Sequence, residues 1–132
     1  MTGRTGPARC LAALLCGVLV TGCSAGVSPA PVADGPPTSD LRVGLLEYRF
    51  ALSAGALRTG PVTVTVTNAG SSGHDMRIYQ GEELLAAVPV LSPGQQQELR
   101  FDVEPGGFVR LDCSVGGHAR AGMVARMAVV DA

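Results

Sequence analysis

The sequence predicts an all-β protein, a Greek-key β-sandwich of about seven to eight strands. Two observations lead to this prediction. Apolar and polar residues alternate with a period of two along several short segments, which is the pattern of half-buried strands. Clusters of glycine, proline, asparagine and serine separate these segments at short intervals, as turns between neighbouring strands do.

The first 22 of the 132 residues are expected to be a secretion signal and not part of the fold. Arg4 and Arg9 precede a short apolar run, residues 11–20, which is shorter than the roughly 20 residues that span a bilayer. Residues 19–22 lead directly into Cys23 and end in small side chains. This ending resembles the bacterial lipoprotein box, and the resemblance implies that Cys23 is acylated. The alternative is an ordinary cleaved signal that happens to contain Cys23.

Residues 23–40 are predicted to form a tether. This stretch is rich in proline and small residues and cannot bury a core, so we expect it to be extended. The folded domain is then predicted to span residues 41–132. The strands in it are expected near 62–67, 99–103, 109–113 and 123–129, where alternation is clearest.

Two further segments of the domain are less regular. Residues 41–50 are strand-like, but the parity of their apolar side chains shifts near 44–46, which predicts a β-bulge. Residues 81–91 carry no clear pattern and are open to three interpretations: a short helix, a loop or an edge strand. Turns are expected at residues 59–61, 68–73, 92–94 and 104–106.

The charge balance excludes one class of function. The chain has no lysine, and removal of the predicted signal leaves eight of its ten basic residues against eleven acidic ones, a net charge of −3. Without a basic run and with few aromatic residues, a nucleic-acid-binding surface is not expected. The mild negative charge favours solubility and identifies no partner.

The cysteines point to a metal. Cys10 and Cys16 lie in the predicted signal and Cys23 would carry lipid, so Cys113 is the one free thiol expected in an oxidising compartment. A lone cysteine can also be a passive buried residue. Here, however, Cys113 is followed after five residues by His118 and after five more by Met123.

The stretch 113–123 is predicted to be a loop whose donors converge. Steps of five residues would scatter side chains around a helix, and three glycines also disfavour a helix. A thiolate, an imidazole and a weak thioether, completed by a second histidine, are the donors of a trigonal copper site. Zinc is the second choice of metal for these donors. The chain has one further histidine, His74.

The alternation supports His74 as the remaining ligand. His74 shares its parity with Met76 and Ile78, so it is expected to point inward with them. By the same reasoning Cys113 ends one inward-facing series and Met123 begins another. Taken singly, His74 would more often be a surface residue and Met123 core filler.

Two motifs resemble the cupredoxins, the blue copper proteins typified by plastocyanin and azurin. Residues 68–75 resemble the turn that leads to the first histidine of that family, and residues 113–123 resemble its ligand loop. The resemblance implies the copper ligands His74, Cys113, His118 and Met123. It also implies that Asp75 ties its loop to the ligand loop through Ser114, whereas Asp75 could otherwise simply cap a turn. One departure is Gly116, which stands where the family often has proline.

These features predict a mononuclear copper protein that carries electrons outside the cytoplasm, held to a membrane by lipid alone. We expect it to be a monomer that serves membrane-associated redox proteins, and not an enzyme, because no open coordination position or acid–base pair is evident. Two alternatives are a copper scavenging or delivery protein, which the glycine at 116 would suit, and a metal-free binding module of cupredoxin type.

Overall fold

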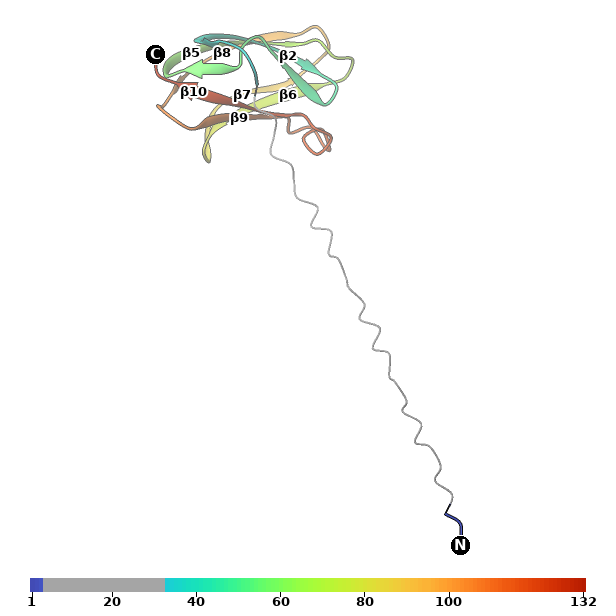
Figure 1. Ribbon diagram of the computed structural model, residues 1–132. Helices are drawn as coiled ribbons and strands as arrows, with labels where there is room; N and C mark the ends of the chain where they lie inside the picture. Colours follow the sequence, from blue (N-terminus) through green and yellow to red (C-terminus); the bar gives the residue numbers. More distant parts are fainter. Residues whose placement is uncertain (4–32) are drawn as a thin grey trace.

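A computed structural model describes residues 1–3 and 33–132 of the chain (Figure 1). Most of the predicted signal, the proposed acylation site Cys23 and the first part of the predicted tether lie outside the described residues. In the part of the chain that the structure describes, no helix is long and apolar enough to cross a membrane.

Ten strands form two sheets that pack face to face (Figure 1). The larger sheet has the order β1-β4-β10-β9-β6-β7, and the smaller has the order β3-β2-β5-β8. The strand bounds are β1 Pro37–Thr38, β2 Asp40–Leu46, β3 Arg49–Leu52, β4 Ala56–Arg58, β5 Gly60–Asn68, β6 His74–Gln80, β7 Glu83–Leu91, β8 Gln96–Val103, β9 Phe108–Asp112 and β10 Val124–Val130. The predicted β-sandwich is confirmed, with more strands than expected.

Alternation explains how the two sheets share one core. In β5 the valines are buried and the threonines between them are half-buried, as expected for a strand with one face against the core. The inward residues of both sheets form one apolar cluster that includes Leu45, Val64, Met76, Leu111 and Met127. This cluster fills the space between the two layers.

The predicted bulge near residues 44–46 is wrong. β2 ends at Leu46, two residues form a turn, and β3 returns antiparallel with Leu46 opposite Arg49. The apolar parity shifts in the sequence because the chain reverses direction there, so that Leu45 and Phe50 face each other across a hairpin. The turn went unnoticed because Glu47-Tyr48 contains no glycine, proline or asparagine.

The segment left open, residues 81–91, contains β7, a strand at the edge of the larger sheet. Its alternation is obscured because two register shifts interrupt its pairing with β6. Pairing also begins earlier than expected: Pro37–Thr38, in the predicted tether, runs parallel to β4 as an edge strand. Proline is compatible with this position because an edge strand does not require every N–H group.

The topology brings three strand ends to one edge of the larger sheet. β9 lies between β6 and β10 and is antiparallel to both. Asp112, the last residue of β9, lies opposite Arg77 of β6 and Val124 of β10, so both neighbouring strands begin at the end of the sheet where β9 finishes. His74 begins β6, Cys113 follows β9 and Met123 precedes β10, so all three are placed at the same end of the sandwich.

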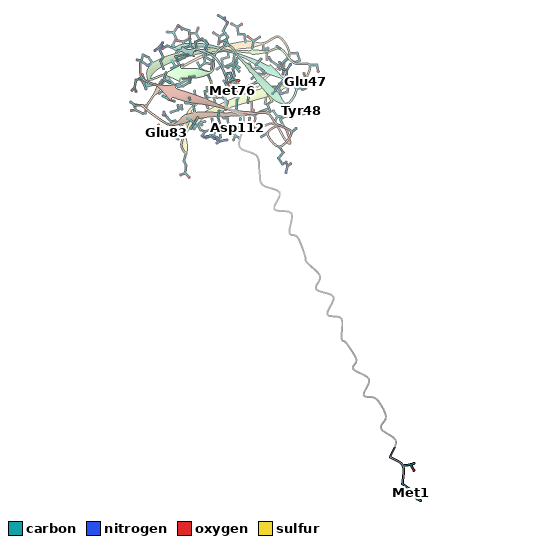
Figure 2. All side chains as sticks on the ribbon, viewed as in Figure 1. Met1, Glu47, Tyr48, Met76, Glu83 and Asp112 are labelled. Atoms are coloured by element: carbon teal, nitrogen blue, oxygen red, sulfur yellow. The ribbon has the colours of Figure 1, made fainter. Side chains whose placement is uncertain are left out.

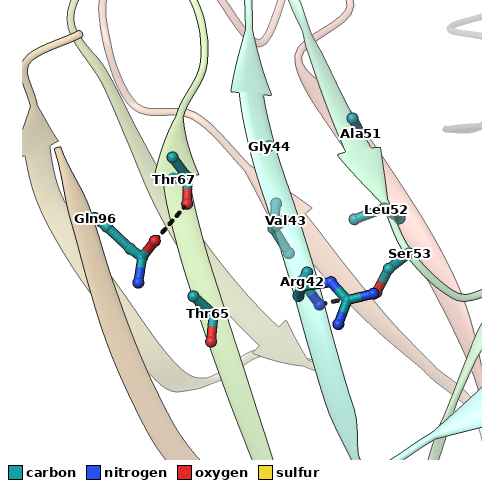
Figure 3. A pocket seen from close by; sticks show the side chains of 9 residues that line it. All are labelled: Arg42, Val43, Gly44, Ala51, Leu52, Ser53, Thr65, Thr67 and Gln96. Carbon is teal, nitrogen blue, oxygen red and sulfur yellow. Dashed lines mark hydrogen bonds between the residues drawn. The ribbon is translucent and has the colours of Figure 1, made fainter. Parts of the chain in front are cut away.

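A shallow hollow of about 430 Å³ lies on the smaller sheet (Figure 3). In its lining, Thr67 donates a hydrogen bond to Gln96 at 3.2 Å, and the backbone N–H of Arg42 donates to Ser53 at 2.9 Å. Its lining contains neither histidine nor cysteine.

Candidate metal centre

Three side chains converge at the end of the sandwich. The Nδ1 atoms of His74 and His118 are 3.2 Å apart, and the Sγ atom of Cys113 is 3.6 Å from Nδ1 of His118. All three donor atoms lie within 4.8 Å of one another. Donors placed about 2.0–2.3 Å from a shared ion are separated by about 3.2–3.8 Å, so this triangle has the size of a metal site.

The burial of these donors differs. His74 and Cys113 are fully buried, whereas His118 is partly exposed. Burial raises the pKa of the Cys113 thiol, so in the absence of a cation the sulfur would keep its proton. A bound cation reverses this preference because it stabilises the thiolate directly. The chemistry of the donor set therefore fits a thiophilic metal ion.

The ligand loop, residues 113–123, folds back on itself as predicted. The N–H of His118 donates to Val115 O at 3.0 Å, and the N–H of Ala121 donates to Gly117 O at 2.9 Å. Gly117 and Gly122 have φ values of 85° and 115°, a region that residues with a side chain rarely adopt. Glycine at these two positions lets the loop close into a compact turn.

Met123 is placed beside Cys113 and His118, the other two candidate ligands in the loop. Its N–H donates to His118 O at 3.0 Å, and its carbonyl accepts a bond from the N–H of Cys113 at 3.2 Å. The side chain is fully buried. Its assignment as the weak axial ligand stays a prediction.

Asp75 and Ser114 join the two ligand-bearing segments, as expected. The N–H of Ser114 donates to Asp75 Oδ1 at 2.5 Å, and the Ser114 hydroxyl donates to the other carboxylate oxygen. Burial alone would raise the pKa of Asp75, but these hydrogen bonds outweigh it and lower the pKa. Because its carboxylate is paired with Ser114, Asp75 can be buried although its strand parity would place it on the solvent-facing side.

Asn68, the first residue of the turn predicted at 68–73, does more than form that turn. It is buried, and its amide donates to Ser72 O at 2.8 Å and to Leu91 O at 2.7 Å. Its oxygen accepts a bond from the N–H of Gly70 at 2.9 Å. One side chain thus fixes the turn before His74 and links that turn to the end of β7.

Glu47 was missed in the sequence. Its carboxylate accepts bonds from the N–H of Ser71 at 2.5 Å, the Ser71 hydroxyl at 3.0 Å and the N–H of Ser72 at 3.3 Å. These bonds, the one from the Ser71 N–H foremost, lower the pKa of Glu47 to about 2. The same oxygen lies 3.7 Å from Nε2 of His74.

The ring of Tyr48, also missed, packs edge-to-face on His118 with ring centroids 5.4 Å apart. The contact could not be read from local sequence because it depends on sheet topology. β2 runs parallel to β5, with Leu45 opposite Asn68, so the turn after β2 lies beside the turn after β5. The parity shift near residues 44–46 was the available signal, and it was interpreted as a bulge and not as a hairpin turn.

Comparison with known proteins agrees with this geometry. No protein-family model and no curated protein sequence matches the chain. Among solved structures, reduced auracyanin from the photosynthetic bacterium Roseiflexus castenholzii superposes with a TM-score of 0.65 at 19% identity, covering 72% of this chain and 99% of the other. The chain has the cupredoxin fold.

Two other solved structures share this cupredoxin fold. Auracyanin A, described as a "blue" copper protein from the green thermophilic photosynthetic bacterium Chloroflexus aurantiacus, gives a TM-score of 0.57 at 16% identity, covering 72% of this chain and 100% of that one. Reduced rusticyanin gives 0.56 at 18% identity, covering 74% and 81%. In this chain, the His74–Cys113–His118 cluster stands at one end of that cupredoxin sandwich.

Proposed function

We propose that this protein binds one copper ion in a type 1 site and carries electrons. The observation that supports this most is the triangle of two imidazole nitrogens and one sulfur, His74, Cys113 and His118, at the end of a cupredoxin sandwich. Soft thiolate and imidazole donors with a weak thioether favour copper over the harder divalent ions.

Each residue has a distinct role in this proposal. His74 and Cys113 would hold the ion from the buried side, His118 from the surface side, and Met123 as the distant fourth donor. Copper bound there supplies one-electron chemistry between Cu(II) and Cu(I). His118 is the partly exposed member of the cluster, so its imidazole is the place where a redox partner approaches the site.

The hydrogen bonding favours electron transfer over copper exchange. The ligand loop is closed by its own backbone bonds, and Ser114 is bound to Asp75 on the neighbouring strand. A site that is held in one geometry needs little rearrangement when the metal changes its charge. Copper delivery is the second candidate. The feature that favours it is the exposed Gly116, where a Cβ would meet nothing within 4 Å, so the loop is not packed at that point.

The setting is part of the same proposal. Acylation of Cys23 would hold the domain on the outer face of a membrane, where membrane-associated redox proteins are the partners expected. We propose a carrier and not an enzyme, because the four donors leave no open position for a substrate.

Titration of the purified full chain with Cu(II) tests the proposal. We expect one equivalent to bind and to produce intense visible absorption from thiolate-to-copper charge transfer. Cys113→Ser should abolish the colour. Fast electron exchange with slow loss of copper to a chelator would support the carrier, and rapid loss would support delivery. A chain that binds no copper would overturn both.

A further inference from the structure

The hairpin turn Glu47–Tyr48 touches both histidines of the cluster from the opposite sheet. It connects β2 and β3 of the smaller sheet, whereas His74, Cys113 and His118 belong to the larger sheet and its loop. Figure 2 shows the two turn residues next to each other at one end of the sandwich. The turn therefore bridges the two layers at the site.

Glu47 faces the side of His74 that is turned away from the other donors. Nδ1 of His74 points to His118, while Nε2 lies 3.7 Å from the Glu47 carboxylate and 3.3 Å from the Ser72 hydroxyl. When Nδ1 binds a metal, the proton of the neutral imidazole resides on Nε2. That N–H then has the Ser72 hydroxyl as its hydrogen-bond partner and the Glu47 carboxylate just beyond hydrogen-bond distance. A carboxylate in this place favours the orientation of a metal-bound histidine through its charge.

Gly70 supplies an independent observation. A Cβ at this position would lie 2.7 Å from the Glu47 carboxylate oxygen and 3.0 Å from Nε2 of His74. The backbone thus passes so close to both groups that no side chain fits between them. Gly116 and Gly117 of the ligand loop, in contrast, have open space at the same point. Glycine at position 70 therefore leaves no side chain between the Glu47 carboxylate and the His74 imidazole.

Tyr48 holds a backbone conformation that favours glycine. Its φ is 61°, and Thr2 is the one other non-glycine residue with positive φ in residues 1–3 and 33–132. The second position of a two-residue turn with positive φ is normally glycine. Here a tyrosine occupies it, half exposed, with its ring against His118. Strained residues of this kind cluster at functional sites.

We propose that the Glu47–Tyr48 turn is a positioning element of the copper site, in which Glu47 orients His74 and favours Cu(II), and Tyr48 holds the ring of His118. The inference rests on the proposed function. The carboxylate stabilises the ion with two positive charges more than the ion with one, so it lowers the reduction potential. Neither residue binds the metal.

The reduction potential of the copper-loaded Glu47→Gln variant tests the proposed role of Glu47. The substitution keeps the size of the side chain and removes its charge. We expect the Cu(II)/Cu(I) ratio at a fixed potential to fall about tenfold, equal to a rise of about 59 mV for a one-electron couple. Glu83→Gln is the matched control, because Glu83 is an exposed glutamate at the opposite end of the sandwich (Figure 2). It should leave the potential unchanged.

The variants Tyr48→Gly and Tyr48→Phe test whether the Tyr48 ring holds His118. Glycine relieves the positive φ, so the folding stability of the metal-free chain should not fall. If the ring holds His118, the glycine variant should lose copper to a chelator about tenfold faster and show a changed charge-transfer spectrum. The phenylalanine variant keeps the ring and should behave as wild type.

The outcomes separate the two levels of the proposal. A wild-type chain that binds no copper overturns the proposed function and this inference with it. A blue wild-type chain whose potential responds equally to Glu47→Gln and Glu83→Gln overturns the part of Glu47 alone. Unchanged copper loss and spectrum in Tyr48→Gly overturn the part of Tyr48 alone.

Discussion

At the scale of single residues, the buried polar side chains around the candidate copper site each have a defined partner. Asp75 is bonded to Ser114, and Asn68 is bonded to three backbone groups. Asp112, which precedes Cys113, accepts a 2.8 Å bond from Arg77. Within the described residues no buried side-chain nitrogen or oxygen lacks a partner. Because unpaired buried groups are costly, each of these residues is expected to be sensitive to substitution.

Asn68→Ala should destabilise the metal-free protein by about 2–3 kcal/mol, because it leaves two carbonyls and one N–H without their partner. Chemical denaturation of wild type and variant measures the difference. Thr67→Ala, which removes the solvent-side bond to Gln96, is the control and should cost less than about 1 kcal/mol. Equal effects of the two substitutions would contradict the linking role of Asn68.

Met123→Leu tests the axial ligand. Leucine keeps the volume of this buried side chain, so the fold should lose less than about 1.5 kcal/mol. If the thioether is a weak donor to copper, its replacement by a side chain with no donor atom should shift the reduction potential, which the axial ligand tunes, while the blue colour of the thiolate bond remains. Redox titration measures this. An unchanged potential would show that Met123 is core filler.

At the scale of elements, the site is a junction of segments from both sheets. The turn before β6, the ligand loop after β9 and the turn after β2 meet at one end, and Asp75–Ser114 ties the first two. The sequence predicted the first two segments because histidine, cysteine and glycine mark them. It did not predict the third, since nothing in Glu47-Tyr48 signals a turn and its neighbours are set by the β2–β5 pairing.

The Asp75–Ser114 tie should make stability depend on pH on the acid side. The folded pKa of Asp75 is lowered, so its contribution is fully present above its unfolded value of 3.8 and is lost as pH falls through the folded value. The stability difference between metal-free wild type and Asp75→Asn should therefore be largest near neutral pH and shrink below about pH 4. Denaturation at a series of pH values measures it, and a constant difference would contradict the role of the tie.

At the scale of the whole molecule, the predictable part of the structure is the part set by local patterns. β5, β8, β9 and β10 follow from alternation, since each has one face in the core. β7 does not, because its register shifts break the pattern, and neither does the start of pairing at Pro37. Four candidate ligand positions were predicted from residue type, strand parity and the resemblance to the cupredoxins, and the donor atoms of three of them, His74, Cys113 and His118, lie together. The residues around these positions, Glu47 and Tyr48 above all, could not be predicted, because their place depends on how one sheet packs on the other.

The sandwich should not need copper in order to fold. Its core is one continuous apolar cluster built from both sheets, and the candidate ligands lie at its end and not at its centre. In this it differs from small metal domains, which are unfolded without their ion. The metal-free chain should therefore show the circular dichroism of strands and a cooperative thermal transition.

Copper should then raise the midpoint of the thermal transition, with a stabilisation of about 4 kcal/mol when free copper is 1,000 times its dissociation constant. Cys113→Ser is the control that should fold and lose most of this gain. A metal-free chain without a cooperative transition would show instead that the site holds the two sheets together.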